Sequence, residues 1–130
     1  MASAGAAAQE DDAEAAAGSA RPPDVSVVIV VYGEEPWLER SISAALGSVG
    51  VTSEVVLVEN GGSEATIARF EQDPRVIVLR PGRNTGFAEG CDLGVAASTA
   101  PQVALINPDA ILEPSALREL VAVASRPGVG

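Results

Sequence analysis

The chain has 130 residues, a hydrophobic fraction of 47% and a formal net charge of -10. This length provides one domain with an ample core, while the acidic balance and the lack of lysine argue against a nucleic-acid partner or a basic patch for anionic lipid. The chain has no histidine, and Cys91 is its single cysteine. It therefore lacks the side chains for a Ser-His-Asp or Cys-His catalytic mechanism and for a typical zinc site, and it cannot form an internal disulfide.

The first 23 residues differ in composition from the rest of the chain. Residues 1–23 consist almost entirely of Ala, Gly, Ser and acidic residues, which offer too little apolar surface to offset the entropy of ordering. We therefore predict a disordered tail followed by one folded domain over residues 24–130. The tail lacks the basic start and leucine-rich centre of a secretory signal, and no apolar run in the chain reaches bilayer length. We expect a soluble protein located in the cytoplasm, with the inner face of the membrane as one place where it would act.

The folded part opens with a strand and a helix. Val25–Val31 is almost continuously apolar and β-branched, which predicts a central strand buried on both faces. After Pro36, apolar residues from Leu38 to Val49 fall at helical spacing. This spacing predicts a helix that ends at Gly50.

A second strand and helix follow, and then a third strand. Glu54–Val58 is a short apolar strand, and Ser63 is placed to cap a helix that runs to about Glu71. Arg75–Leu79 is the third predicted strand.

The next segment, residues 86–98, is predicted to be a helix with two different faces. One face repeats glycine every fourth residue, at Gly86, Gly90 and Gly94. A face without side chains lets a backbone or a ligand approach closely. The other face carries Phe87, Cys91 and Val95, and this apolar stripe places Cys91 in the core.

The last strand is predicted at Gln102–Ile106. Glu113-Pro114 then starts a helix whose apolar residues face inward: Leu117, Leu120, Val121 and Ala124. Strands that alternate with helices indicate a Rossmann-like α/β fold, with a parallel sheet covered on both faces. Because nothing follows to cover the last strand, we expect a truncated domain whose open apolar edge promotes self-association.

One candidate ligand residue follows the last strand. Asp109 lies on the Asn107-Pro108 turn, where a carboxylate can bind a hard cation such as Mg²⁺ or Mn²⁺ that bridges to phosphate oxygens. Asn, Pro and Asp are also ordinary turn residues. The alternative is therefore that Asp109 only caps the turn.

Further candidates follow the first two strands. Glu59 and Asn60 end the second strand, where a carboxylate can accept hydrogen bonds from a base or ribose; the alternative is a solvated turn at Asn60-Gly61. Tyr32 after the first strand offers a ring for a nucleobase, or it packs with its hydroxyl in water.

The segment from Arg83 to Gly90 joins the third strand to its helix. Main-chain N–H groups at a helix start together with a guanidinium suit a diphosphate. The alternative is a tight joint in which Asn84 or Thr85 caps the helix. A dinucleotide-binding oxidoreductase is disfavoured, because Glu34 and Glu35 stand in the first loop where a glycine-rich phosphate loop is expected.

The first two strand ends resemble motifs of glycosyltransferase family 2 enzymes with the GT-A fold, and in particular of their rhamnosyltransferase-like branch. Residues 25–32 resemble the opening VSVVIVtYN strand, with Gly33 where Asn is usual. Residues 58–63 resemble the VDNaS turn, with Glu59 in the place of an Asp that contacts the nucleobase.

The later segments extend this resemblance. Residues 83–94 are similar to NxGFAxGxNxG, with Asp92 where Asn is common. Residues 105–109 resemble the LLNPD form of the metal-binding DxD motif, which makes Asp109 the metal ligand. The resemblance covers residues 24–130, the whole predicted domain.

The resemblance implies an enzyme that moves a hexosyl group from a nucleoside-diphosphate sugar to a hydroxyl of a glycan or lipid-linked acceptor, usually with inversion, in cell-wall or polysaccharide biosynthesis. It implies Mg²⁺ or Mn²⁺ at Asp109 and a general base beyond residue 130. The predicted substrate-binding residues are Tyr32, Glu59, Asn60, Arg83, Asn84, Gly86 and Asn107. The alternative is a non-catalytic fragment that binds nucleotide sugar, or a scaffold, without the acceptor half.

Overall fold

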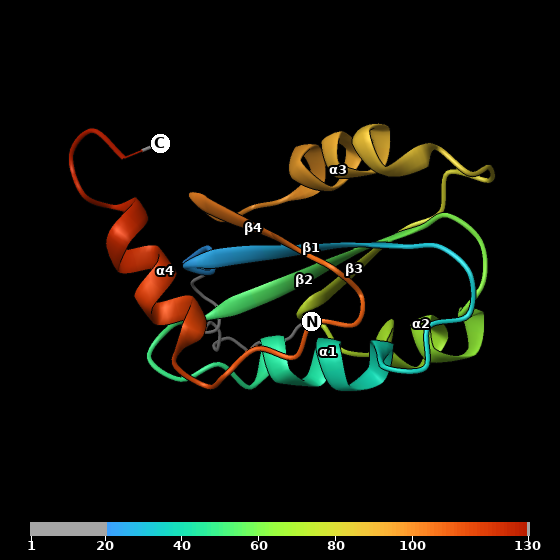
Figure 1. The fold of residues 1–130 in the computed structure, drawn as a ribbon, viewed down its shortest axis with the longest axis horizontal. Helices are drawn as coiled ribbons and strands as arrows, with labels where there is room; N and C mark the ends of the chain where they lie inside the picture. The colour runs from blue at the N-terminus through green and yellow to red at the C-terminus, as the bar shows by residue number, and fades with distance from the viewer. Residues whose placement is uncertain (1–20, 130) are drawn as a thin grey trace, which may run out of the picture.

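Four parallel strands form the centre of the protein (Figure 1), in a computed structural model that describes residues 21–129. The strands lie in the order β3-β2-β1-β4. The elements are β1 (Val25–Val31), α1 (Leu38–Leu46), β2 (Ser53–Glu59), α2 (Glu64–Phe70), β3 (Val76–Leu79), α3 (Gly86–Ala97), β4 (Gln102–Ile106) and α4 (Ala116–Ala124). The predicted Rossmann-like α/β fold is therefore confirmed, whereas residues 1–20 of the predicted tail lie outside the described range.

Strand β1 is the inner strand on which the sheet is built. Each of its seven residues is buried, and it pairs in parallel with β2 on one side and β4 on the other. Val27 lies between Val55 of β2 and Ala104 of β4 in this register. An apolar run without polar alternation suits a strand that is covered on both faces.

Helices cover both faces of the sheet. In Figure 1, α3 lies on one face and α1 and α2 lie on the other. The core between the sheet and α1 includes Leu38, Ile42 and Ala45 of the helix, all fully buried. Helix α4 adds the fully buried Leu117 to the same core.

Helix α3 packs through its glycines, as the sequence predicted. A methyl group added at Gly94 would lie only 2.3 Å from Cγ1 of Val28 in β1, so the absence of a side chain there allows the close approach. The neighbouring apolar stripe was assigned wrongly, because Phe87 and Val95 are exposed and Cys91 is only half-buried. Burial, with a smaller contribution from the negative charge of Asp92, raises the pKa of the Cys91 thiol.

Three other local expectations differ from the structure. Helix α1 ends at Leu46, and Val49 is exposed beyond it. Helix α4 begins later than predicted, at Ala116, and its Leu120 faces solvent. Ser63 precedes α2 but makes no side-chain cap, because its hydroxyl oxygen accepts from the N–H of Glu35 instead, while the hydroxyl donates to the carbonyl oxygen of Gly33.

A buried polar cluster joins the amino ends of β1 and β2 to the α3–β4 loop. The carboxylate of Glu54 accepts hydrogen bonds from the Ser26 hydroxyl (2.6 Å) and from the main-chain N–H (2.7 Å) and hydroxyl (2.9 Å) of Thr99. The hydroxyl oxygen of Ser26 in turn accepts from the N–H of Ala100. Glu54 and Ser26 are both buried, and these bonds satisfy polar groups that are costly to bury alone.

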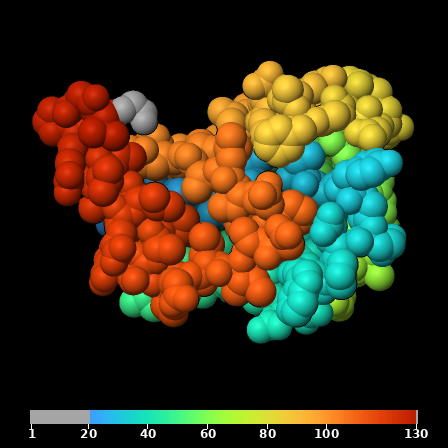
Figure 2. Space-filling view, in the orientation of Figure 1, coloured from blue at the N-terminus to red at the C-terminus, as the bar shows by residue number. Residues whose placement is uncertain are grey.

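Strand β4 forms an open edge of the sheet, as predicted. A groove of about 300 Å³ runs between β4 and α4, and Leu105 and Leu120 line it with largely exposed side chains. On the face shown in Figure 2, the orange segment that contains β4 is open to solvent between α3 and α4. Over residues 21–129, no helix has the length and apolar character needed to cross a bilayer.

Candidate functional site

The loops that follow β1, β2 and β3 gather at the carboxyl end of the sheet, at the right of Figure 1. Two neighbouring pockets of about 280 Å³ each open there. Glu59, Asn60, Gly61, Gly82, Arg83 and Asn84 line the first pocket, which we call the polar pocket. Val30, Tyr32, Asn60, Asn84, Gly86 and Phe87 line the second, which we call the aromatic pocket. The two pockets share Asn60 and Asn84, so they form one continuous candidate site.

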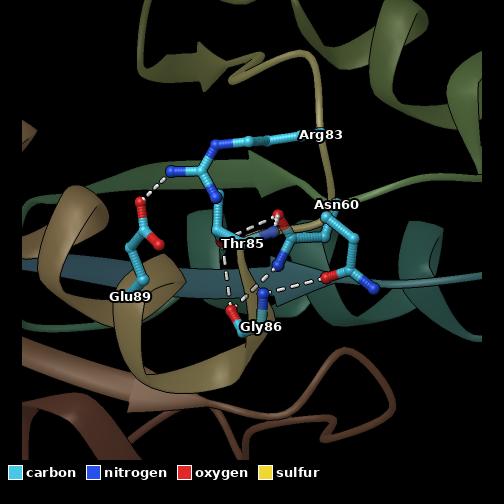
Figure 3. A network of polar contacts seen from close by, with 6 residues as sticks. Asn60, Arg83, Thr85, Gly86 and Glu89 are labelled. Atoms are coloured by element: carbon cyan, nitrogen blue, oxygen red, sulfur yellow. Dashed lines mark hydrogen bonds and ion pairs between the residues drawn. The ribbon is translucent and has the colours of Figure 1, made fainter.

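Asn60 holds the end of β2 to the start of α3 (Figure 3). Its Oδ1 accepts hydrogen bonds from the N–H (3.2 Å) and the hydroxyl (2.9 Å) of Thr85, and its Nδ2 donates to the carbonyl oxygen of Gly86 (3.1 Å). Its own N–H donates to the carbonyl oxygen of Val31. Asn60 is 4% exposed, so this buried side chain fixes the wall between the two pockets.

Asn84 supports the same helix start from the other side. Its Oδ1 accepts a hydrogen bond from the N–H of Gly86 at 2.9 Å, and Gly86 has a φ of 78°, a conformation that favours glycine. The tight joint considered as the alternative is therefore present. The N–H groups of Thr85 and Gly86 already donate to side-chain oxygens. The first main-chain N–H group of α3 that could donate to an anion is therefore that of Phe87.

The loops after β1 and β2 are joined to each other beside this site. The N–H of Gly33 donates to the carbonyl oxygen of Gly61, and the N–H of Glu35 donates to the hydroxyl oxygen of Ser63. The carboxylate of Glu34 accepts from the N–H of Ser63. The first loop is therefore fixed by polar contacts with the second and does not form a glycine-rich phosphate cradle.

Among the described residues that line the two pockets, Arg83 is the one basic side chain. Its Nη2 donates to the Oε2 of Glu89 in the first turn of α3 (Figure 3). Arg80, three residues earlier, is engaged elsewhere, since its hydrogen bonds to Glu71 and Glu64 raise its pKa. Arg83 is therefore the cation that these pockets can offer to an anionic ligand.

Two aromatic rings give the aromatic pocket its character. Tyr32, at the end of β1, and Phe87, at the start of α3, are each 64% exposed. Tyr32 was predicted from its place at a strand end. Phe87 is absent from the predicted site, because the sequence predicts that the stripe it begins faces the core; its position directly after the helix-start glycine is the signal that could have found it.

Asn107 and Asp109 stand apart from the two pockets. Both are exposed on the turn after β4, which the N–H of Ala110 closes with the carbonyl oxygen of Asn107 at 3.0 Å. Because β4 neighbours β1, the turn follows the same end of the sheet, roughly two strand spacings or about 10 Å from the end of β2. Neither residue lines the two pockets, so the structure brings six of the predicted site residues together and leaves these two beside them.

The amino-acid sequence is similar to those of several curated proteins. The chain is 32% identical over 108 residues to the succinoglycan biosynthesis protein ExoO of Rhizobium meliloti (strain 1021). The aligned region covers 82% of this chain and 31% of that protein. It is 24% identical over 103 residues to an uncharacterized glycosyltransferase of Haemophilus influenzae, and this aligned region covers 76% of this chain and 32% of that protein. The chain thus spans about a third of the length of these relatives.

Solved structures share the fold. The mannosyltransferase PcManGT of Pyrobaculum calidifontis, in complex with GDP-Man and Mn²⁺, matches with a TM-score of 0.74 at 21% identity, over 85% of this chain and 34% of that one. A crystal structure of S. aureus TarS (residues 1–349) matches with a TM-score of 0.68 at 14% identity, over 78% and 32% of the two chains. The model of glycosyl transferase family 2 matches residues 26–130. The chain therefore belongs to glycosyl transferase family 2.

Proposed function

We propose that this chain is the nucleotide-sugar-binding half of a glycosyltransferase that moves a hexosyl group from a nucleoside-diphosphate donor to an acceptor hydroxyl. The observation that carries the proposal is the pair of adjoining pockets at the strand ends, which join aromatic rings to one carboxylate and one guanidinium. A nucleoside diphosphate needs the same three kinds of contact: an apolar surface for its base, polar groups for its ribose, and cations for its phosphates.

Each group has a role that follows from its chemistry. Tyr32 and Phe87 offer ring faces to a nucleobase. The carboxylate of Glu59 lines the polar pocket and can accept hydrogen bonds from a base or from ribose hydroxyls. Arg83 can donate to diphosphate oxygens in a bidentate manner. Asn60 and Asn84 hold the helix start that separates these subsites.

Asp109 is our proposed ligand for Mg²⁺ or Mn²⁺, with Asn107 beside it. Its carboxylate is exposed and makes no hydrogen bond or ion pair within residues 21–129. No cluster of three or more metal-ligating side chains occurs in that range. This arrangement fits a cation held by one carboxylate, with phosphate oxygens and water as the other ligands. When bound, such an ion would neutralise charge on the departing diphosphate.

Membership in glycosyl transferase family 2 and the similarity to a succinoglycan biosynthesis protein support the remaining parts of the proposal. Inversion at the sugar carbon, a rhamnosyltransferase-like specificity, a general base beyond residue 130 and a glycan or lipid-linked acceptor stay predictions. The succinoglycan biosynthesis protein supports a role in polysaccharide synthesis. A site of action in the cytoplasm, at the inner face of the membrane, would suit such a lipid-linked acceptor.

Calorimetric titration tests the proposed function. We expect UDP, GDP or another nucleoside diphosphate to bind in the presence of Mn²⁺, and we expect its affinity to fall at least about tenfold when the ion is removed with EDTA, because one arginine alone must then balance the diphosphate. The free nucleoside serves as a control and should show little dependence on Mn²⁺. Equal affinity with and without the ion would contradict metal-assisted binding.

We also propose that a second copy pairs with the open β4 edge. An unpaired edge strand offers main-chain donors and acceptors to an identical strand across a twofold axis, and the apolar groove beside it adds surface to bury. Light scattering at increasing concentration should show a dimer, and Val103→Lys should shift it toward the monomer, because lysine on an edge strand blocks pairing.

A matched variant separates edge pairing from general changes in charge. Val123→Lys adds the same charge on α4, outside the residues that line the groove, and the two valines are similarly exposed (38% for Val103 and 43% for Val123). We expect Val123→Lys to leave the mass unchanged. A monomer at every concentration in the unmodified chain would contradict the proposal.

A further inference from the structure

Glu89 lies where it can compete with a ligand for the cation of the site. Arg83 lines the polar pocket, and among the described residues that line either pocket it alone is basic. Its guanidinium donates from Nη2 to the Oε2 of Glu89. Figure 3 shows the Arg83 side chain extended toward Glu89 beside the start of α3. The guanidinium that would bind an anion is thus already engaged by a carboxylate of the chain itself.

The Arg83–Glu89 ion pair is open to solvent. The Arg83 side chain is 60% exposed and the Glu89 side chain is 46% exposed. Ion pairs with this exposure contribute little to stability, because water competes with both partners and salt screens them. The pair can therefore separate at low cost when a stronger anion arrives.

The loop backbone does not depend on this ion pair. Asn60 holds Thr85 and Gly86, and the side chain of Asn84 holds the N–H of Gly86. Arg83 can therefore exchange partners while the walls of both pockets stay in place. Within residues 21–129, the Glu89 contact is the one hydrogen bond of the Arg83 side chain, which leaves further donors of the guanidinium fork for an incoming ligand.

We propose that Glu89 is a specificity-determining residue that reserves Arg83 for ligands with a strong, multiply charged anion. This inference rests on the proposed function, because it takes the diphosphate of a nucleotide sugar as the ligand that displaces Glu89. A diphosphate has enough oxygens to accept two parallel hydrogen bonds from the guanidinium, whereas Glu89 accepts one. A nucleoside without phosphate gains nothing at Arg83 and leaves the ion pair intact.

Titration of Glu89→Gln tests this role. We expect the variant to bind the nucleoside diphosphate that the unmodified chain prefers about two- to fivefold more tightly at low salt, a range set by the small energies of exposed ion pairs. The affinity for the matching nucleoside should not change. The gain should vanish when Arg83 is replaced by alanine in the same chain, and it should shrink at high salt.

A matched control removes the same charge elsewhere. Glu119 is an exposed residue of α4 that lines neither pocket, so Glu119→Gln should leave both affinities unchanged. Equal or weaker diphosphate binding in Glu89→Gln would overturn the inference, and so would a gain that persists without Arg83.

Inorganic pyrophosphate separates this inference from the proposed function. Tighter pyrophosphate binding by Glu89→Gln, monitored by the NMR signal of the Arg83 side chain, would support the role of Glu89 even if no nucleotide binds. Failure of both pyrophosphate and every nucleoside diphosphate to bind either form would overturn the inference together with the proposed function.

Discussion

Asp109→Asn is expected to remove most of the Mn²⁺-dependent affinity for a nucleoside diphosphate. Asp109 is the one carboxylate on the turn after β4 that we propose as a metal ligand, and an amide lacks the negative charge that a hard cation prefers. Even outer-shell partners of metal ligands change affinity by about 10- to 100-fold, so we expect a loss of at least about tenfold. Titration with and without Mn²⁺ measures the loss.

Stability and a matched variant show whether the effect belongs to the proposed metal site. Asp109 is exposed and forms no hydrogen bond or ion pair within residues 21–129, so its replacement should change the free energy of unfolding by less than about 0.5 kcal/mol. Asp92→Asn, an exposed change of the same charge on α3, should leave binding intact. Unchanged Mn²⁺-dependent affinity in Asp109→Asn would remove Asp109 from the site.

Glu54→Ala is expected to cause a large loss of stability. The substitution leaves the buried hydroxyl of Ser26 and the N–H of Thr99 without their acceptor. Ser26 is buried, whereas Thr99 is exposed and its N–H can bond to water instead. One unsatisfied buried donor costs about 1–3 kcal/mol, so we expect a loss of about 1–3 kcal/mol from a total stability of about 5–15 kcal/mol. Denaturant unfolding followed by circular dichroism measures this change.

Glu54→Gln is the matched control, because glutamine can reproduce the whole network. Its carbonyl oxygen can accept from the Ser26 hydroxyl and the Thr99 N–H, while its NH₂ donates to a reoriented Thr99 hydroxyl. We expect a free energy of unfolding within about 1 kcal/mol of the original. The cluster lies at the amino ends of the strands, so nucleotide affinity should not change. Similar stability of the alanine and glutamine variants would refute this account.

The order and type of the elements could be predicted from local sequence. The β-branched run Val25–Val31 has no polar alternation, and a strand of this kind is stable only when both faces are covered. Alternation with helices then requires parallel pairing, which places the carboxyl ends of neighbouring strands along one edge. For this reason Tyr32, Glu59 and Asn60 could be assigned to one site before any geometry was known.

The sheet-facing side of α3 shows the limit of periodicity. Two stripes with the same spacing, one of glycine and one of apolar side chains, both qualify as packing faces in the sequence. In the structure the glycine stripe faces the sheet, where Gly90 and Gly94 contact Val30 and Val28 of β1. A helix face without side chains can lie closest to a strand whose own side chains are branched. Phe87 was thereby turned outward into the aromatic pocket.

By itself, the sequence determined the strand core, the succession of elements and the edge of the sheet at which the candidate residues meet, because these depend on hydrophobic pattern and chain direction. Only the tertiary structure decided that Asn60 holds the start of α3, that Arg83 pairs with Glu89 and that Glu54 is buried against Thr99. Asn60 and its partner Thr85 are 25 positions apart, and Glu54 and Thr99 are 45 apart. Whether such polar side chains meet depends on how helices and loops pack around the sheet, which a local pattern does not encode.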